Sequence, residues 1–395
     1  MSALSEHEIE PIDTPISTVL LDDLGQWLGN HDEIAPDTLA RLHDENERLA
    51  LLSFLHRHWL MGAFIQRLKT SSLFSGLEPD FQEYLEHIER FYLTRNERIK
   101  DEVVFACRIL HENNIPAIVM KGASGLFNET FHPLSIRFMT DIDLLVPERE
   151  QAKAIQCLLD AGYWQDQDEM DISAANHHHA PPLARDNQGL CLLEIHQWPI
   201  KKRYQPILPL EDIWNNAEPL PLTTDRVAQQ LSATEQLILS VAHCELSHRA
   251  YEEKYLDWRQ LHNSACLIHR FAEDIHWDSV TDTFEQTGHL PELRAHLYMV
   301  ETYFGVNVPI TVRTEQAKAH LQQCIELLVE RQGKSNPWTT VKSILSGYKK
   351  ENIDVMYGAN NMWQLTLGRI KHAKRHIKML TKPKYFNDFI NRLRN

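Results

Sequence analysis

The fold of this chain is decided by residues 115–146, which read IPAIVMKGASGLFNETFHPLSIRFMTDIDLLV. A short apolar run ends in Lys121 and Gly122, and a second apolar run begins at the acidic pair Asp141 and Asp143. Side chains two apart in a strand lie on the same face, so both carboxylates can hold one divalent cation. The apolar residues that follow the pair are typical of a strand buried in a sheet. The sequence therefore predicts a site at the start of this second strand.

A third carboxylate is expected from a neighbouring strand. Glu194 lies in the apolar run CLLEIHQW, residues 191–198, where an isolated acid is costly to bury. Mg²⁺ prefers hard oxygen ligands and retains several waters, so two or three carboxylates plus substrate phosphates are sufficient to hold it. We therefore predict that Asp141, Asp143 and Glu194 form a site for Mg²⁺ or Mn²⁺.

An anion-binding turn is predicted where the first apolar run ends. Gly122 permits close approach of the backbone to a phosphate, and backbone amides at the start of the next helix, including that of Ser124, favour an anion. Lys121 adds a point charge. Arg137 precedes the acidic pair by four residues, and two roles stay open for it: binding phosphate, or holding one of the two aspartates in place.

Histidines gather near the predicted acids. His196 shares the face of Glu194, and it contacts a phosphate, shuttles a proton, braces the carboxylates, or is simply a structural residue. The run that begins at His177 has no Cys or His at zinc-finger spacing. A pocket wall formed by His178 or His179, or a solvated loop, is therefore favoured over a zinc site.

These residues resemble the core of the DNA polymerase beta-like nucleotidyltransferase superfamily, and within it a family described as uncharacterised nucleotidyltransferases. The resemblance extends from Phe91 to Asp257. Its matching features are the strand 115–120, Lys121-Gly122, the helix after them, Arg137, the Asp-x-Asp pair followed by LLV, and LEIHQW at 193–198. Many members carry adjacent Gly and Ser after the first strand, whereas here Ser124 lies two residues beyond Gly122.

The resemblance implies an enzyme that moves NMP from an NTP, by default ATP, to a hydroxyl or amine acceptor and releases pyrophosphate. It places the third acid at Glu194, whose added role is to orient or deprotonate the nucleophile. The implied catalytic residues are Asp141, Asp143 and Glu194. The implied nucleotide-binding residues are Lys121, Gly122, Ser124, Arg137 and His196. The acceptor-side candidates are His178, His179, His243, His248 and Asp257, the last three being equally compatible with core or surface positions.

Two other functions stay open. A regulatory module would keep the fold and bind nucleotide without turnover, but the intact acidic trio argues against it. A glycosyltransferase would use Asp-x-Asp to hold the metal of a nucleotide sugar. A much larger nucleotide-binding sheet should precede its acids, and the upstream stretch here is helical. The acceptor is undetermined: small antibiotics, sugars, lipids, tRNA ends and protein side chains all fit.

The predicted architecture is α+β, with a small mixed-sheet core flanked by N- and C-terminal helical domains. The expected regions are a helical one at 1–110, the nucleotidyltransferase-like core at 111–215, and a helical one with a basic tail at 216–395. Apolar residues at three- and four-residue spacings in ALLSFLHRHWLMGAFIQRL, residues 50–68, indicate helices before the core.

Local signals predict the connections. Asn113-Asn114 ends the helix before the first strand, and Pro147 begins a helix that runs to Asp160. A loop or hairpin is expected at 164–187. The chain is expected to be helical beyond Pro221, where Ser232-x-x-Glu235 forms a capping box.

Composition narrows the partners. The chain has 395 residues, is 43% hydrophobic and carries a formal charge of -15, which argues against a general charge-driven nucleic-acid binder. Only the basic tail, residues 369–395, offers a surface for nucleic acid or membrane, with a solvated helix face as the simpler interpretation. No secretory signal is evident, and no apolar run approaches the roughly 20 residues that span a bilayer. Six cysteines without CxxC pairing indicate a reducing cytoplasm.

Overall fold

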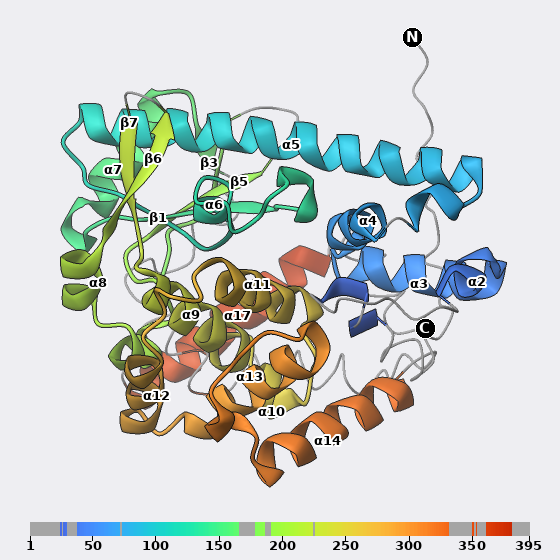
Figure 1. Cartoon of the computed structure of the whole chain (residues 1–395). Helices are drawn as coiled ribbons and strands as arrows, with labels where there is room; N and C mark the ends of the chain where they lie inside the picture. Colours follow the sequence, from blue (N-terminus) through green and yellow to red (C-terminus); the bar gives the residue numbers. More distant parts are fainter. Residues whose placement is uncertain are drawn as a thin grey trace.

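The computed structural model describes residues 24–25, 27–29, 38–71, 73–165, 178–185, 191–223, 226–331, 350, 353 and 361–380. Its sheet lies between the long helix α5 on one side and the C-terminal helices on the other, and the N-terminal helices pack beside them (Figure 1). The protein is therefore α+β with helices flanking a mixed sheet, as predicted.

The sheet has seven strands in the order β3-β4-β5-β2-β1-β7-β6. Their bounds are β1 Ile118–Met120, β2 Asp141–Leu145, β3 Trp164–Gln165, β4 Leu183–Ala184, β5 Leu192–His196, β6 Glu218–Thr223 and β7 Arg226–Gln230. The central strand β2 is antiparallel to β1 and parallel to β5. The two strands predicted to carry the acids are thus neighbours, and β3 and β4 form the expected hairpin by antiparallel pairing.

Alternation along β2 decides which way the acids face. Ile142 and Leu144 pack into the core under α5, whereas Leu145 belongs to the core shared with the helical half. Asp141 and Asp143 have the same parity as Leu145, so their carboxylates point toward the C-terminal helices.

Two strands lie beyond residue 215, the predicted end of the core. The expectation that the chain turns helical after Pro221 is wrong for this stretch, because β7 pairs with β1 and β6 pairs with β7. Proline cannot donate a ladder hydrogen bond and is confined to sheet edges. Pro219 and Pro221 fit this rule because β6 is the edge strand, and the same prolines concealed the strand in the sequence.

The N-terminal helices are α2 Thr38–His43, α3 Glu45–Arg57, α4 Met61–Thr70 and α5 Pro79–Glu112. The helix α5 begins with Pro79 in its first turn, where a missing N–H costs nothing. It ends at Asn113, and Asn114 takes a left-handed φ of 57° that turns the chain into β1. The predicted Asn-Asn break is confirmed.

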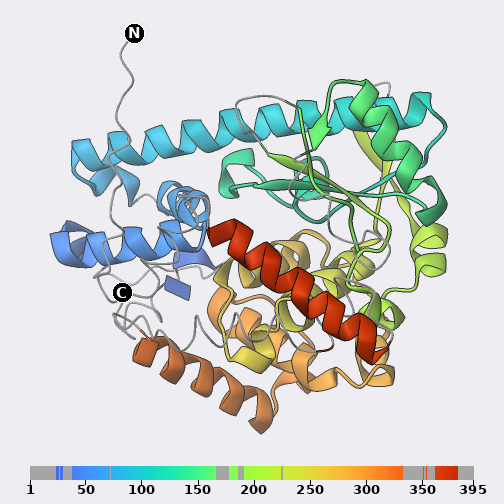
Figure 2. The same ribbon diagram turned by 180° about the vertical axis from the view of Figure 1, so that it is seen from behind.

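The helices after the sheet are α9 Ala233–Ala242, η7 His243–Ser247, α10 Ala250–Glu253, α11 Trp258–Arg270, α12 Trp277–Gln286, α13 Leu290–Phe304, α14 Glu315–Arg331 and α17 Met362–Leu380. Of these, η7 is a π-helix and α17 crosses the back of the helical half (Figure 2). The predicted capping box of Ser232 and Glu235 begins α9. Trp258 of α11 packs against Phe54 of α3, with ring centroids 5.7 Å apart, and so joins the two helical groups in one core.

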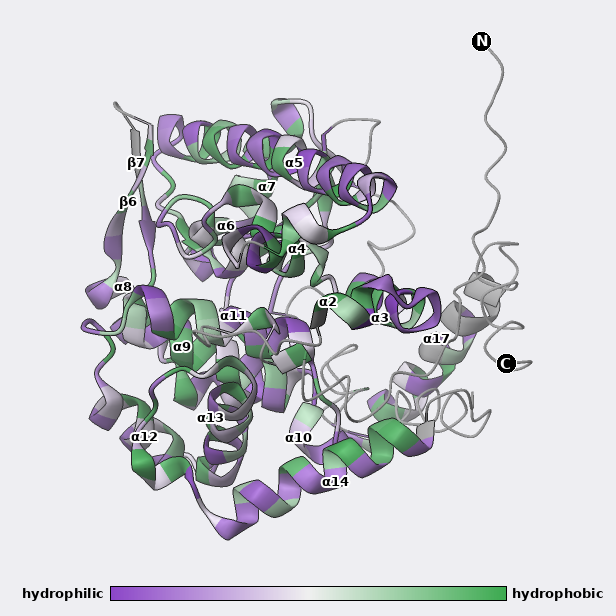
Figure 3. Ribbon diagram, turned by 45° about the vertical axis from the view of Figure 1, so that its right-hand side comes forward, coloured by the Kyte–Doolittle hydropathy of each residue, from purple (hydrophilic) through white to green (hydrophobic). Residues whose placement is uncertain are grey.

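Short helices fill the connections. They are η1 Phe74–Gly76, α6 Lys121–Gly125, η2 Leu134–Ile136, η3 Glu148–Glu150, α7 Gln151–Asp160, η6 Lys202–Ile207, α8 Leu210–Asn216 and η8 Ile310–Val312. The helix predicted from Pro147 to Asp160 is thus present as η3 followed by α7. Hydrophilic and hydrophobic residues alternate along α5 and α14 (Figure 3), and among the described residues no helix is long and apolar enough to cross a bilayer.

Candidate functional site

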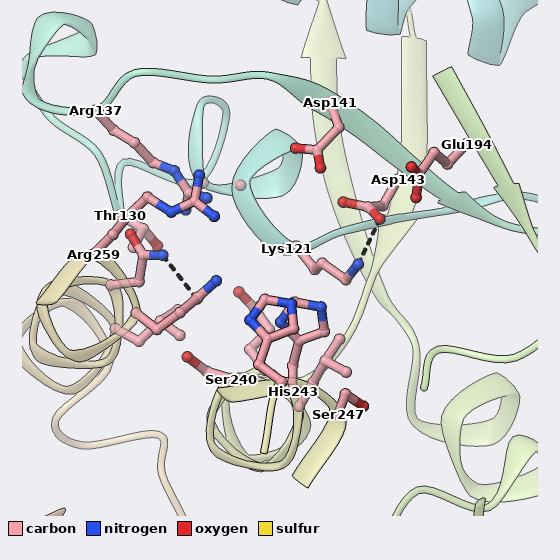
Figure 4. Close-up of a pocket in the computed structure, with 18 of the residues that line it drawn as sticks. Lys121, Thr130, Arg137, Asp141, Asp143, Glu194, Ser240, His243, Ser247 and Arg259 are labelled. Carbon is pink, nitrogen blue, oxygen red and sulfur yellow. Dashed lines mark hydrogen bonds and ion pairs between the residues drawn. The ribbon is translucent and has the colours of Figure 1, made fainter. Parts of the chain in front are cut away.

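A cavity of about 410 Å³ lies between the sheet and the helices α9, η7 and α11. All three predicted acids line it (Figure 4). The other predicted site residues on its walls are Lys121, Gly122, Arg137, His178, His179, His243 and His248. Residues far apart in the sequence, from Lys121 to Leu267, therefore meet at one cavity.

The acids are brought together by strand register. Asp143 of β2 lies opposite Glu194 of β5 in the parallel pair, and Asp141 lies two residues before Asp143 on the same face. Asp143 is 2% exposed, so its charge needs partners. The carboxylates of Asp143 and Glu194 come close enough to His196 that one ion can touch all three residues.

His196 lies beneath the carboxylates and has no exposed surface. Its Nε2 is 2.8 Å from Asp143 Oδ1 and 3.3 Å from Glu194 Oε2, while Nδ1 is 3.2 Å from the carbonyl oxygen of Trp198. Both ring nitrogens thus face acceptors, and the Nε2 contacts to the carboxylates are ion-pair distances without hydrogen-bond geometry among the described residues. Burial lowers the pKa of His196, but the two neighbouring carboxylates outweigh it and raise the pKa. Among the roles predicted for His196, the geometry favours bracing the acids.

Lys121 sits where β1 meets α6, with a left-handed φ of 51° that is uncommon outside glycine. Its Nζ lies 2.6 Å from Asp143 Oδ1. Burial alone would raise the pKa of Asp143, but the Lys121 ammonium and the His196 imidazole hold that pKa well below its usual range. Asp143 is therefore a carboxylate held ionised by two basic neighbours.

Asp141 and Glu194 respond differently to the same surroundings. Burial and the negative charge of Asp143 raise the pKa of Asp141, so negative charge is in excess at that end of β2. Burial would also raise the pKa of Glu194, but His196 and His179 outweigh it and lower the pKa. His179 Nε2 lies 3.6 Å from Glu194 Oε2.

Gly122 lets an arginine approach the turn. A Cβ at Gly122 would come within 2.8 Å of Arg137 Cζ and 2.6 Å of Met139 Sδ. Burial and the charge of Arg259 lower the pKa of Arg137 to about 10. Arg137 Nε is buried and has no hydrogen-bond partner among the described residues. This guanidinium has donors left for a ligand.

The remaining predicted residues have varied positions. Ser124 is buried and its hydroxyl donates to the carbonyl of Lys121 at 2.9 Å, behind the cavity wall. His178 and His179 form a wall, while His177 lies outside the described residues. Asp257 accepts from the Gln260 amide as the N-cap of α11.

His243 and His248 lie on the helical wall, with ring centroids 4.2 Å apart. Burial and the nearby Lys121 charge hold the pKa of His243 well below its usual range, so its ring is neutral. His248 Nδ1 is 3.7 Å from Asp257 Oδ2. Asp257 thus supports a wall residue and does not line the cavity itself.

Several cavity residues escaped the sequence interpretation. They come from α9, η7, α11 and the loops: Thr130, Phe131, Lys201, Gln236, Ser240, Ser247, Arg259, Gln260 and Asn263. A weak signal was available, because Gln260, Asn263 and Ser264 are polar residues on the apolar face of the strongly amphipathic helix α11.

A mixed sheet that presents acids from two adjacent strands, beside a lysine-glycine turn, defines the nucleotidyltransferase class. The chain belongs to the uncharacterised nucleotidyltransferase family, whose model matches residues 44–305. Membership supports nucleotidyl transfer from an NTP as the general activity. Curated proteins yield no match to this chain.

Proposed function

We propose that the protein is a Mg²⁺- or Mn²⁺-dependent enzyme that moves NMP from an NTP to a hydroxyl or amine acceptor and releases pyrophosphate. The observation that carries this proposal is the convergence of Asp141, Asp143 and Glu194 on one cavity whose other walls carry Lys121 and Arg137. ATP is the default nucleotide. The cytoplasm is the proposed compartment, in keeping with six free cysteines.

The donor set fits a hard divalent cation. Three carboxylates supply oxygen ligands. Burial, followed by the charge of Asp143, raises the pKa of Asp141, and a bound cation would oppose both effects. Asp141, Asp143 and Glu194 would hold the metal, which when bound neutralises phosphate charge and acidifies an attacking hydroxyl. His196, sealed beneath them, keeps Asp143 and Glu194 oriented.

The cationic side chains suit a triphosphate. Lys121 lies beside Asp143 at the strand end, and Arg137 offers an unpartnered Nε within the described part of the chain. The charge of Arg259 acts on Arg137 from α11, so an anion between the two guanidiniums would relieve their repulsion. We assign Lys121, Arg137 and Arg259 to the phosphates, with Gly122 providing the clearance. Ser124 supports the turn from behind through its bond to the Lys121 carbonyl.

The acceptor side is assigned to the opposite walls. His178 and His179 line the cavity beside β5, where His179 forms a bridge with His196. His243 lines it from η7 (Figure 4). Asp257 contributes through His248. Glu194 lies between the metal position and His179, where it would orient the acceptor.

One observation favours a nucleotide-binding module without turnover as the second candidate. Lys121 Nζ and His196 Nε2 already lie within 2.8 Å of Asp143 Oδ1, so this carboxylate has charged or polar partners without a metal. Labelled transfer separates the two functions: protein is incubated with Mg²⁺ or Mn²⁺ and each α-labelled NTP, with and without lysate. Transfer of label with release of pyrophosphate supports the enzyme. Binding of NTP with no product under any condition supports the module.

A further inference from the structure

A chain of hydrogen bonds leads from the cavity to a buried carboxylate. Ser240 Oγ lies 2.9 Å from Ser264 Oγ, which lies 2.9 Å from His296 Nε2. The other ring nitrogen of His296, Nδ1, lies 2.7 Å from Glu245 Oε1. Ser240 lines the cavity, whereas Ser264 and His296 have no exposed surface. One end of the chain therefore meets ligand space and the other end is sealed in the core.

Four separate elements hold these side chains: Ser240 lies on α9, Ser264 on α11, His296 on α13 and Glu245 on η7. The π-turn of η7 is closed by the amide of His248 bonding the carbonyl of His243 at 3.0 Å. Turns of this kind occur frequently at functional sites. Here the π-helix presents His243 to the cavity while it directs Glu245 into the core toward His296.

The chemistry of each group sets the direction of the hydrogen bonds. A carboxylate only accepts, so Nδ1 of His296 carries a proton, and in the tautomer with its proton there Nε2 accepts. Ser264 must then donate to His296, and its oxygen accepts from Ser240. The Ser240 oxygen is left to accept from the cavity. It is therefore matched to a ligand group that donates, which is what a hydroxyl or amine nucleophile does.

We propose that Ser240 binds the nucleophilic group of the acceptor and that Ser264, His296 and Glu245 form a relay that removes its proton. This inference rests on the proposed nucleotidyl transfer. The acceptor oxygen or nitrogen forms a bond to the α-phosphorus while the bond from that phosphorus to pyrophosphate breaks, and pyrophosphate leaves with the electron pair. The acceptor proton passes to Ser240, the Ser240 proton to Ser264, and the Ser264 proton to His296 Nε2. The resulting imidazolium is paired with Glu245.

The proposal gives Glu194 and Ser240 different roles in the site. The Glu194 carboxylate faces imidazole nitrogens of His196 and His179, at 3.3 and 3.6 Å, on the sheet side. The relay instead approaches from the helical side, through Ser240 (Figure 4). Glu194 would orient the acceptor, and Ser240 would both hold it and accept its proton. Ser264, His296 and Glu245 act through Ser240 and are positioning residues.

The test compares variants of the full chain, using Mg²⁺, α-labelled ATP and heat-treated lysate as the source of acceptor. Ser240→Ala removes the hydroxyl, and Ser240→Thr retains it. His296→Gln places an amide near the Nε2 position, which can bond Ser264 but cannot take a proton. We expect kcat to fall about 100-fold in Ser240→Ala and His296→Gln, with the Kd for ATP within about twofold of wild type and with activity recovered in Ser240→Thr.

Ser232→Ala is the matched control, because Ser232 caps the same helix, α9, with its hydroxyl bonded to Glu235. It should lower the melting temperature and leave kcat unchanged. Wild type without transfer would overturn the proposed function. Active wild type with both variants within about threefold of it, or a loss in Ser240→Ala alone, would overturn only the relay. If His296→Gln does not fold, the solvent deuterium isotope effect on kcat is compared in Ser240→Ala and Ser240→Thr. We expect wild type and Ser240→Thr to show the same isotope effect. The relay is rejected if the isotope effect in Ser240→Ala is also unchanged.

Discussion

The ammonium nitrogen of Lys121 lies 2.6 Å from Asp143 Oδ1, and His196 Nε2 lies 2.8 Å from the same oxygen. Two basic groups thus meet at one buried carboxylate. At Asp141, two residues earlier, the charges of Lys121 and Arg137 do not outweigh burial and the charge of Asp143, which raise its pKa. Removing one partner of a buried pair leaves an uncompensated charge and is strongly destabilising. Isosteric amides keep the shape of the side chain but remove its charge, so tests of this site measure stability alongside activity.

The double change Asp141→Asn with Asp143→Asn should abolish metal-dependent nucleotide binding. In wild type, ATP with Mg²⁺ at 100 times its Kd should stabilise the fold by about 2.7 kcal/mol, and the variant should lose this gain. Thermal melts and calorimetry with ATP, with and without Mg²⁺, measure both quantities. Asp101→Asn, at an exposed site on α5, is the control. A variant that still binds ATP in a Mg²⁺-dependent way would reject the assignment.

Glu194→Gln should cut turnover by at least about 100-fold while weakening ATP binding much less, because Asp141 and Asp143 still hold the nucleotide-bound cation. Label transfer gives kcat, and titration calorimetry gives Kd. The comparison variant is Glu148→Gln on η3, which is exposed. If affinity and stability fall in step with turnover, Glu194 is a structural residue of β5.

Gly122→Ala should impair the phosphate side of the cavity. The new Cβ would meet Arg137 Cζ at 2.8 Å and Met139 Sδ at 2.6 Å, so one of these side chains has to move. We expect a loss of about 1–3 kcal/mol in stability and weaker ATP binding. Gly76→Ala is the matched control, since its Cβ meets the end of the Leu39 side chain at 3.0 Å. Equal ATP affinity in both variants would contradict the role given to Arg137.

The stability of the protein should fall in mild acid, partly through His262. Burial and the charge of Arg137 lower the pKa of His262 to about 4, whereas an unfolded histidine titrates near 6.5. The unfolded state therefore takes up the proton first, and stability decreases as pH falls from about 6.5 toward 4. Between pH 7.5 and pH 5 this histidine should account for about 2 kcal/mol.

Urea unfolding of wild type and His262→Gln at the two pH values measures that contribution. The variant should lose about 2 kcal/mol less than wild type over this interval. His269→Gln, at an exposed position on the same helix, should follow the wild type. An identical loss in wild type and His262→Gln would show that His262 does not titrate as described.

The sheet was predictable where its strands are apolar runs. The runs before Lys121 and after Asp141 are apolar because α5 and α7 cover one face of the sheet. The apolar residue types by themselves indicate that these strands are buried. The prediction failed at β6 and β7. Pro219 and Pro221 are typical of a loop sequence. Only the pairing of β7 with β1, and of β6 with β7, shows that this stretch completes the sheet.

The acids were predictable because they lie on the strands that form the core, and an acid in an apolar run is itself a signal. The pKa shifts of the groups around these acids were not predictable from the sequence. The pKa of His196 is raised because strand register brings its Nε2 within 2.8 Å of Asp143. The next turn brings the Trp198 carbonyl to its Nδ1.

By itself the sequence determined the α+β class, the place of the acidic strands and the turn at Lys121 and Gly122, since each depends on residues near one another along the chain. Only the tertiary structure decided what faces those acids. Arg259 and Ser240 come from helices that reach the sheet through a shared apolar core. Packing of apolar surface is non-directional, so the polar groups it brings to a cavity are known only once the helices have docked.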